Sequence, residues 1–399
     1  QLMSRDAPPD EIMMHLRAKW VHLAHSFIVY ARCGLYNKGF SNFVTTHFVI
    51  ISSTFDMREG KVAVITGTNS NLGINIAYRL LDEIDADTNL TIVVTSRTLP
   101  RVKDVINDIK KHAREKLPHR TGFLEFDYLL VDFTNMVSIL GAYYDLQKKF
   151  AHIDYIFVNA AQGCYSGIDW LAACKCIASN LLDAVTFPTY KIQRVGVESD
   201  DGMGLIFQGN AFGPYYFMHR IRPLLAGGGR IVWISSVMSG AKYLSFNDLQ
   251  LLRSHEPYEG SKRLVDLIHT GTHAALKKNH DIRSYVVHPG IFTSFSFFQY
   301  LNFVTYYGMM FLFYIARFLG STIHNILGYT AANAPVCVAL QDRRQEMKLA
   351  SSCDRWGREF IDTLEIDPTG AEDVVAYMDK LVAEWDEKLK DQITPTRVP

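Results

Sequence analysis

The sequence lacks the features that mark several common classes of protein. Its 399 residues include 41 basic and 41 acidic side chains, and a nucleic-acid-binding surface needs a basic excess that this balance does not provide. The 6 cysteines form no Cys-x-x-Cys pair and no Cys/His group with zinc spacing. We therefore expect no metal site and a reduced compartment that faces the cytosol. No Gly-x-Ser-x-Gly elbow follows a predicted strand, which disfavours hydrolase chemistry.

The first part of the chain shows no clear hydrophobic period, whereas the residues after Met57 are strongly patterned. It also lacks the compact apolar stretch and small-residue cleavage site of a secretory signal. We interpret residues 1–56 as an N-terminal extension of unknown order, with an anchor as the alternative. Residues 57–295 are expected to form the core domain. Residues 296–399 are expected to form an apolar lid and a C-terminal part, of which 340–399 is charged, helical in places and a solvated cover.

Short apolar runs rich in β-branched residues alternate with helical patterns from Lys61 onward. Helical spacing follows the first run at Leu72, Ile76 and Leu80. This alternation predicts an α/β fold, a Rossmann-like doubly wound parallel sheet in a single domain, which binds ligands beyond the carboxyl ends of its strands. Residues 162–202 break the pattern and are interpreted as an insertion. The predicted strands are residues 61–67, 90–97, 123–133, 153–161, 230–236 and 282–290.

The turn between the first strand and the first helix has the sequence TGTNSNLG, from Thr66 to Gly73. Glycine is needed where the backbone approaches a phosphate, and a helix N-terminus offers free N–H groups to the anion. Gly67 and Gly73 fit this pattern, whereas Asn71 stands where a further glycine is usual. Asparagine tolerates left-handed backbone better than most residues, so we expect the turn to survive. A dinucleotide is the expected ligand, and its predicted contacts here are Gly67, Asn69, Asn71, Leu72 and Gly73.

Two charged residues at strand ends bear on which dinucleotide binds. Arg97 follows the second strand, where NAD-binding proteins usually place an acidic residue against the ribose 2′-hydroxyl. An arginine instead accommodates a 2′-phosphate. The alternative is an exposed arginine at a strand end without a ligand. Asp132, after the third strand, is predicted to meet the adenine edge, and the sequence thus favours NADPH.

Tyr258 and Lys262 lie four residues apart, directly after Pro257, so their side chains share one helix face. Free tyrosine has a pKa of about 10. A lysine ammonium one turn away, with the positive charge that develops on a nicotinamide, is expected to lower that pKa. Each polar residue alone has an ordinary structural interpretation, but the whole set in this order indicates a catalytic site. Its other members are Asn159, Asn210, Ser235 with Ser236, and Pro289 in the sequence His288–Gly290.

These motifs resemble those of short-chain dehydrogenases/reductases over about residues 58–295. Within that superfamily the chain is most similar to the fungal-type sterol 3-keto reductases of C-4 demethylation, and this narrower resemblance extends to about residue 390. It is carried by TGTNSNLG, WISS, SFNDLQLLRSHEPYEGSK and GREFIDTLEID. Asn71 and Ala161 stand where the family's motifs have glycine. The resemblance implies reduction of a 3-keto sterol to the 3β-alcohol in ergosterol synthesis.

The resemblance also implies a role for each residue of the site. Tyr258 would protonate the carbonyl oxygen, Lys262 would lower its pKa and hold the nicotinamide ribose, and Ser236 would orient the same oxygen. The spacing from serine to tyrosine is longer than usual, which leaves Ser235 as an alternative. Asn210 would position a water that links Lys262 to solvent. The further predicted cofactor contacts are Asn159, Pro289 and Thr293.

An uncharged aromatic segment runs from Ile291 to Ala316. Its length is sufficient to cross a bilayer, but Gln299 and Asn302 make a segment lying in the membrane interface at least as reasonable. A buried substrate lid is the alternative. The resemblance implies an endoplasmic-reticulum or lipid-droplet location with the catalytic core facing the cytosol. It also implies membrane lipid and other sterol C-4 demethylation proteins as partners.

Two other functions stay open at this point. One is reduction of another lipophilic ketone, such as a steroid, retinoid or acyl chain, for which the lid and the insertion would shape the pocket. The other is a non-catalytic scaffold that binds NADPH at the membrane. The presence of Asn210, Ser236, Tyr258 and Lys262 together counts against the scaffold, which has no need of all four.

Overall fold

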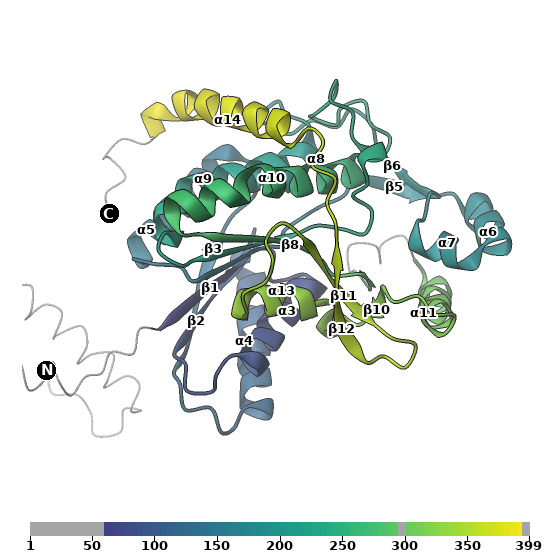
Figure 1. Cartoon of the computed structure of the whole chain (residues 1–399), viewed down its shortest axis with the longest axis horizontal. Coiled ribbons are helices and arrows are strands. Elements are labelled where there is room, and N and C mark those ends of the chain that lie inside the picture. The colour runs from purple at the N-terminus through teal and green to yellow at the C-terminus, as the bar shows by residue number, and fades with distance from the viewer. Residues whose placement is uncertain (1–59, 294–300, 393–399) are drawn as a thin grey trace, which may run out of the picture. The chain divides into compact units, whose positions relative to one another are not determined.

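The computed structural model describes residues 60–293 and 301–392. These residues form an eight-stranded sheet with the strand order β12-β11-β8-β7-β4-β1-β2-β3 and with helices on both faces (Figure 1). The predicted N-terminal extension, residues 1–56, lies outside the described residues. The described part of the chain has the α/β architecture that the sequence predicts.

Six strands of this sheet coincide with the six predicted apolar runs. They pair in parallel throughout, and the apolar character of the inner strands follows from burial on both faces of a parallel sheet, whereas β3 lies at the edge and is largely exposed. Their carboxyl ends therefore meet at one edge of the sheet, where ligands bind in such folds. The six strands are β1 (Lys61–Ile65), β2 (Leu90–Ser96), β3 (Leu124–Leu130), β4 (Tyr155–Val158), β7 (Arg230–Ile234) and β8 (Arg283–His288).

Two hydrophobic cores flank the sheet, one beneath each helical layer (Figure 1). The apolar stripes of the helices, spaced at three and four residues, fill these cores. On one face lie α3 (Asn71–Glu83), α4 (Leu99–Lys116), α12 (Gly328–Ala331) and α13 (Asn333–Leu340). On the other lie α5 (Met136–Lys149), α8 (Leu205–Phe207), a π-helix (Gln208–Phe212), α9 (Gly213–Leu225), α10 (Pro257–His280) and α14 (Ala371–Lys388).

The last two strands correct the prediction for residues 340–399. β11 (Lys348–Cys353) pairs in parallel with β8, β12 (Glu359–Leu364) pairs antiparallel with β11, and every residue of β11 is buried. The core sheet therefore does not end at residue 295, and this part of the chain is not merely a cover. Its sequence, KLASSC, has no apolar run, so only the neighbouring strands reveal it. The helix α14 packs against α10.

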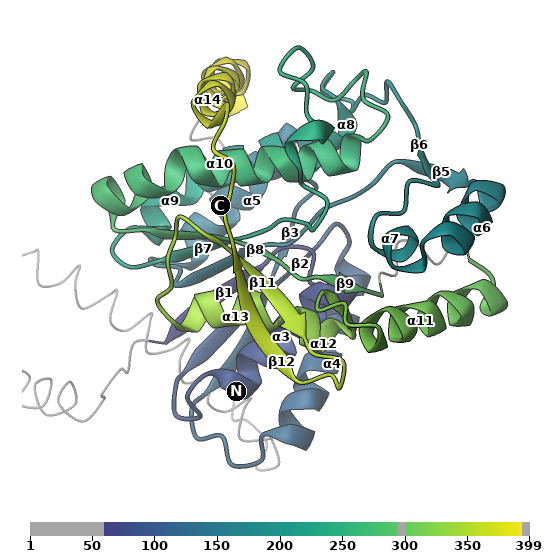
Figure 2. The same cartoon turned by 45° about the vertical axis from the view of Figure 1, so that its right-hand side comes forward.

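The predicted insertion forms a lobe beside the sheet. It contains β5 (Tyr165–Ile168), α6 (Trp170–Ser179), α7 (Leu181–Thr186) and β6 (Lys191–Gln193), with β5 and β6 paired antiparallel. The helix α11 (Phe303–Phe318) packs against α7 (Figure 2). A small core of Val185, Phe313, Ala316 and Ile326 joins the two. The predicted lid segment therefore packs against the insertion, although the two are distant in the chain, and its closure over a substrate stays a prediction.

The aromatic segment is only partly described, because residues 294–300 lie outside the described residues. Before this gap is β9 (Ile291–Phe292), paired with β10 (His324–Ile326), and after it is the 16-residue helix α11. Within residues 60–293 and 301–392, no helix is both long and apolar enough to span a membrane.

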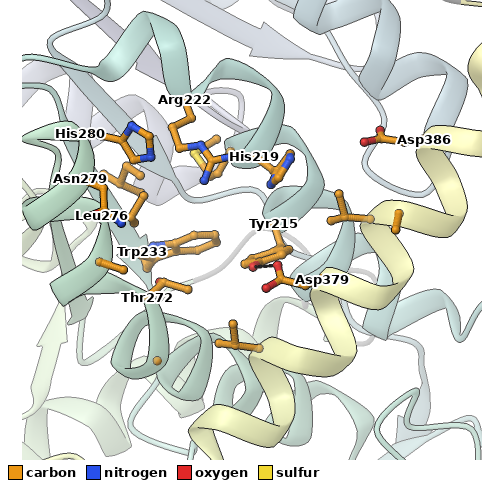
Figure 3. A pocket seen from close by; sticks show the side chains of 17 residues that line it. Tyr215, His219, Arg222, Trp233, Thr272, Leu276, Asn279, His280, Asp379 and Asp386 are labelled. Atoms are coloured by element: carbon orange, nitrogen blue, oxygen red, sulfur yellow. Dashed lines mark hydrogen bonds between the residues drawn. The ribbon is translucent and has the colours of Figure 1, made fainter.

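A pocket of about 500 Å³ lies between α9, α10 and α14 (Figure 3). Its floor includes Trp233 of β7, and the Tyr215 hydroxyl at its side donates a hydrogen bond of 2.6 Å to Asp379. None of the predicted site residues lines this pocket. It results from the way α14 bridges α9 and α10, and it is separate from the candidate active site.

Candidate active site

The turn from β1 into α3 is closed so tightly that only glycine fits at two positions. Gly67 has a φ of +63°, a left-handed conformation that favours glycine. A Cβ on Gly67 would lie 3.0 Å from the Cα of Ala160, and one on Gly73 would lie 2.4 Å from the Gly67 carbonyl oxygen. Ser70 caps α3 by accepting a hydrogen bond of 3.0 Å from the Gly73 N–H. The two glycines therefore let the start of α3 pack closely against the turn and the end of β4.

Asn159 holds this turn from the end of β4. Its Nδ2 donates to the carbonyl oxygens of Thr66 and Gly67, at 2.8 and 3.2 Å. Its own N–H donates to the Thr66 hydroxyl at 2.8 Å. The structure thus brings the predicted residue to the turn and uses its side chain to shape the backbone.

Asn71 is accommodated in the turn without a left-handed conformation. It is the first residue of α3, and it is not among the described non-glycine residues with positive φ. Its Nδ2 donates to the Thr293 carbonyl oxygen at 2.6 Å and its Oδ1 accepts from Asn75 at 2.9 Å. The turn tolerates Asn71 because this residue is simply helical. The same contact brings Thr293 to the turn from 222 positions along the chain.

Three other predicted cofactor contacts lie in or near this turn: Asn69 within it, Leu72 at the start of α3, and Pro289 after β8. Leu72 is 4% exposed and packs in the core, so only its backbone can face a ligand. Asn69 is half-buried in the turn itself. The Pro289 carbonyl oxygen, after β8, accepts a hydrogen bond of 2.7 Å from Asn325. These residues define the rim of one site at the carboxyl edge of the sheet.

Arg97 and Asp132 follow β2 and β3 at the same edge. Arg97 is exposed, and its guanidinium makes no hydrogen bond or ion pair with another of the described residues. Asp132 is half-buried, and its Oδ1 accepts from the N–H and hydroxyl of Thr134, at 2.9 and 2.7 Å. Arg97 is therefore free to bind an anion, whereas one oxygen of Asp132 already stabilises its own turn.

The structure distinguishes the two candidate serines after β7. Ser235 is 3% exposed, and its hydroxyl accepts a hydrogen bond of 3.0 Å from the Nζ of Lys348 behind the site. Ser236 is half-buried, and its hydroxyl accepts a hydrogen bond of 3.0 Å from the Met238 N–H. Ser236 is thus the more exposed of the two, and the Ser235 hydroxyl is engaged by a buried lysine, which favours Ser236 as the catalytic serine.

Tyr258 and Lys262 share one face of α10, as predicted. The Lys262 Nζ lies 5.6 Å from the centre of the Tyr258 ring and donates a hydrogen bond of 2.9 Å to the Ile234 carbonyl oxygen. Burial is the main cause that lowers the pKa of Lys262 to about 8. Burial, and then Glu259, raise the pKa of Tyr258, so the expected lowering is not a property of the chain alone. Tyr258 is a neutral phenol, the form that donates a proton.

Asn210 lies in the π-helix that precedes α9. Its Oδ1 accepts a hydrogen bond of 2.8 Å from the Gln162 N–H, while its Nδ2 donates to the Gln162 carbonyl oxygen and the Ser261 hydroxyl, at 2.8 and 3.0 Å. Both ends of the amide are engaged. The side chain therefore fixes the first turn of α10 against the loop after β4.

Three further residues contact this site without having been predicted. The ring of Tyr165 lies 6.3 Å from that of Tyr258. Gln193 accepts a hydrogen bond of 3.2 Å from the Tyr258 N–H and donates one of 2.6 Å to Glu259. Tyr165 and Gln193 come from the irregular insertion, and the third residue, Lys348, from the unrecognised strand β11. No local sequence pattern marks Lys348, which follows a charged stretch that includes Arg343, Arg344 and Glu346.

Comparison with known proteins agrees with this geometry. The family "short chain dehydrogenase" matches residues 61–299. The 3-keto-steroid reductase ERG27 of Candida albicans is 64% identical over 86% of this chain and 99% of its own length. Those of Saccharomyces cerevisiae (59% identical, 85% of this chain, 99% of its own) and Yarrowia lipolytica (44%, 84% and 98%) are also similar. The chain belongs to the short-chain dehydrogenase family.

Membership of this family implies NADH or NADPH as the cofactor, and the residues present fit such a group. The close packing at Gly67 and Gly73 keeps the turn short and sets the N-terminus of α3 directly after β1 at the carboxyl edge of the sheet, which is a favourable position for an anion. Lys262 and the loop that follows β7, residues 235–239 (the serine loop), lie at the same carboxyl edge of the sheet. A bound nicotinamide would supply the hydride that ketone reduction requires.

Proposed function

We propose that this protein is an NADPH-dependent 3-keto-steroid reductase that converts the C-3 ketone of sterol intermediates to the 3β-alcohol in ergosterol synthesis. The observation that carries the proposal is the 64% identity to a 3-keto-steroid reductase over 99% of that protein's length. The arrangement of Ser236, Tyr258 and Lys262 supports it, because together they can bind and protonate a carbonyl oxygen.

The proposed mechanism assigns one task to each of these side chains. The neutral Tyr258 donates its hydroxyl proton to the carbonyl oxygen as that oxygen gains negative charge. The Ser236 hydroxyl donates a hydrogen bond to the same oxygen and holds it at the phenol. The Lys262 ammonium stabilises the tyrosinate left behind and carries the proton that restores it. Asn210 keeps the first turn of α10 in place, with a bound water as the proposed link from Lys262 to solvent.

The experiment that tests the function is reduction of a 3-keto sterol by the purified full chain in detergent with NADPH. Formation of the 3β-alcohol, identified by chromatography against both 3-hydroxy epimers, is the expected result. A panel with retinal, another ketosteroid and a ketoacyl ester tests the alternative of a different lipophilic ketone. Tight NADPH binding without turnover of any ketone would instead favour the scaffold and contradict the proposal.

The free guanidinium of Arg97 supports NADPH over NADH. We expect Arg97→Ala to raise the KM for NADPH about 10- to 100-fold, since a charge-assisted hydrogen bond to the 2′-phosphate is lost. The KM for NADH should stay within about twofold, because NADH lacks that phosphate. Arg101→Ala is the matched control, an exposed arginine one turn further on in α4. An equal effect on both cofactors would show that Arg97 does not select between them.

The lid carries an exposed apolar surface that supports membrane association. One side of α11 exposes Phe303, Phe311 and Phe318 by 76%, 65% and 63%, and α6 exposes Leu171 by 77%. Aromatic side chains on one helix face are typical of helices that lie in a membrane interface. We propose that this surface rests on the endoplasmic-reticulum membrane or a lipid droplet, with the catalytic core in the cytosol. Other sterol C-4 demethylation proteins are the proposed partners there.

This surface predicts a change in lipid binding. We expect Phe303→Ser with Phe311→Ser to lower the fraction of full chain that co-floats with phosphatidylcholine vesicles by roughly tenfold or more, because burial of each phenylalanine contributes about 1.5–3 kcal/mol. The control is Phe123→Ser with Tyr128→Ser, two exposed aromatic residues at β3. Undiminished flotation of the α11 variant would place the lipid contact elsewhere in the chain.

A further inference from the structure

Behind the serine loop, a buried lysine makes four polar contacts. Lys348, the first residue of β11, is 5% exposed. Its Nζ lies 2.8 Å from the Asp266 Oδ2 and 2.6 Å from the Ser239 Oγ. It also donates to the Ser235 hydroxyl at 3.0 Å and to the Ser236 carbonyl oxygen at 2.9 Å. One ammonium group therefore holds both ends of the loop from Ser235 to Ser239.

Asp266 connects this loop to the catalytic helix. It lies in α10 one turn after Lys262, as Lys262 lies one turn after Tyr258, so the three side chains follow one helix face. The Asp266 Oδ2 accepts from the Ser239 hydroxyl at 2.6 Å as well as from Lys348. The loop that carries Ser236, the helix that carries Tyr258 and Lys262, and β11 thus meet at one ion pair.

The net contribution of this pair to fold stability is expected to be small. A buried ion pair loses much of its attraction to desolvation, and apolar residues of similar volume often replace it without loss of stability. Asp266 is 3% exposed, and its Oδ1 has no hydrogen-bond partner among the described residues, which is costly for a carboxylate. What the pair does provide is a fixed link between the loop that carries Ser236 and the helix that carries Tyr258.

We propose that Lys348 and Asp266 are positioning residues of the reductase, which hold the serine loop against α10 and set the charge around Lys262. This inference rests on the proposed function. The network contacts neither the reacting carbonyl nor its hydride donor, and it acts through Ser236 and Lys262. We therefore expect the network to change the rate of the chemical step and the pH dependence of that rate.

The two members of the pair act on Lys262 in opposite directions. Burial is the largest effect on the pKa of Lys262 and lowers it. The charge of Asp266 raises this pKa by a smaller amount, and the charge of Lys348 lowers it. Removing Lys348 should therefore raise the pKa of Lys262, and removing Asp266 should lower it further. The other titratable or charged groups facing the network are Arg263 and His269 of α10 and His288 of β8.

The test compares Lys348→Met, Asp266→Asn and the double variant with the wild type, using kcat, the ketone KM, the NADPH Kd and the pH profile of kcat. We expect Lys348→Met to lower kcat about 100-fold, since small displacements of a catalytic group cost that much, with KM and Kd within threefold. The alkaline limb of the profile should move to higher pH in Lys348→Met and to lower pH in Asp266→Asn. In the double variant it should return towards the wild type, while kcat stays low because the contacts to Ser235 and Ser239 remain lost.

The control is Arg79→Met, in α3, which removes a partly exposed ion pair of 2.6 Å with Glu359 that makes no contact with the serine loop. The proposal would be overturned if the folded double variant kept the full wild-type kcat. It would also be overturned if the alkaline limb of the pH profile moved in the same direction in both single variants. An equal loss of kcat in Arg79→Met would overturn it as well. The variants are compared on whichever ketone the wild type reduces fastest. Wild-type activity on another ketone but not on a 3-keto sterol would refute the proposed substrate and leave the comparison of variants intact.

Discussion

Replacing Tyr258 with phenylalanine is expected to lower kcat for ketone reduction by roughly 10³-fold, within the range that a general acid contributes. The variant keeps the ring, which is half-buried in α10, and loses only the proton donor. The ketone KM and the NADPH Kd should therefore stay within about threefold. Single-turnover kinetics in detergent, with NADPH fluorescence for the Kd, would measure each value.

The neighbouring Tyr165 provides a matched control for this prediction. Its ring lies 6.3 Å from that of Tyr258, and burial raises its pKa well above the ordinary value. We expect Tyr165→Phe to lower kcat by less than about tenfold, because no proton transfer depends on its hydroxyl. A larger loss in Tyr165→Phe than in Tyr258→Phe would identify Tyr165 as the acid and contradict the mechanism.

Replacing Lys262 with methionine is expected to be nearly as damaging as the loss of Tyr258. Methionine fills a similar buried space but removes the ammonium that stabilises tyrosinate. We expect kcat to fall by about 10²- to 10³-fold, and the NADPH Kd to rise at least threefold if Lys262 also holds the ribose. A fall in kcat without any change in Kd would refute that contact with the cofactor.

The pKa of Lys262 also predicts the pH dependence of the wild type. Burial lowers this pKa to about 8, and the proposed role requires the protonated form. The protonated fraction falls as pH rises through 8, so kcat should fall about tenfold per pH unit above it. Tyr258 stays protonated there because its own pKa is raised. Lys262→Arg should move the limb beyond the measurable range, since arginine keeps its proton, and an unmoved limb would exclude Lys262 as its origin.

Much of the fold could be predicted because its signals are local. Continuous β-branched runs alternating with helical patterns predict a parallel sheet wherever they occur, and six of its strands were found in this way. The strand β11 was missed because Lys348 to Cys353 contains no apolar run. Its burial comes from pairing with β8 on one side and β12 on the other, which no local pattern encodes.

The predicted site residues could be assigned to one edge of the sheet, but their contacts could not. The sequence left Ser235 and Ser236 as alternatives, and the choice depends on Lys348, more than 100 positions away. It also left open how the turn accommodates Asn71, at which α3 begins. A short motif indicates that a turn exists, but the packing of distant segments determines where its helix starts.

By itself, then, the sequence determined the parallel sheet, the need for glycine at Gly67 and Gly73, and the shared helix face of Tyr258 and Lys262. Each of these follows from backbone sterics or helical periodicity within a few residues. Only the tertiary structure decided that Ser236 is more exposed than Ser235, that Lys348 and Asp266 lie behind the serine loop, and that burial raises the pKa of Tyr258. Burial, desolvation and charge at these groups are set by segments far apart in the chain.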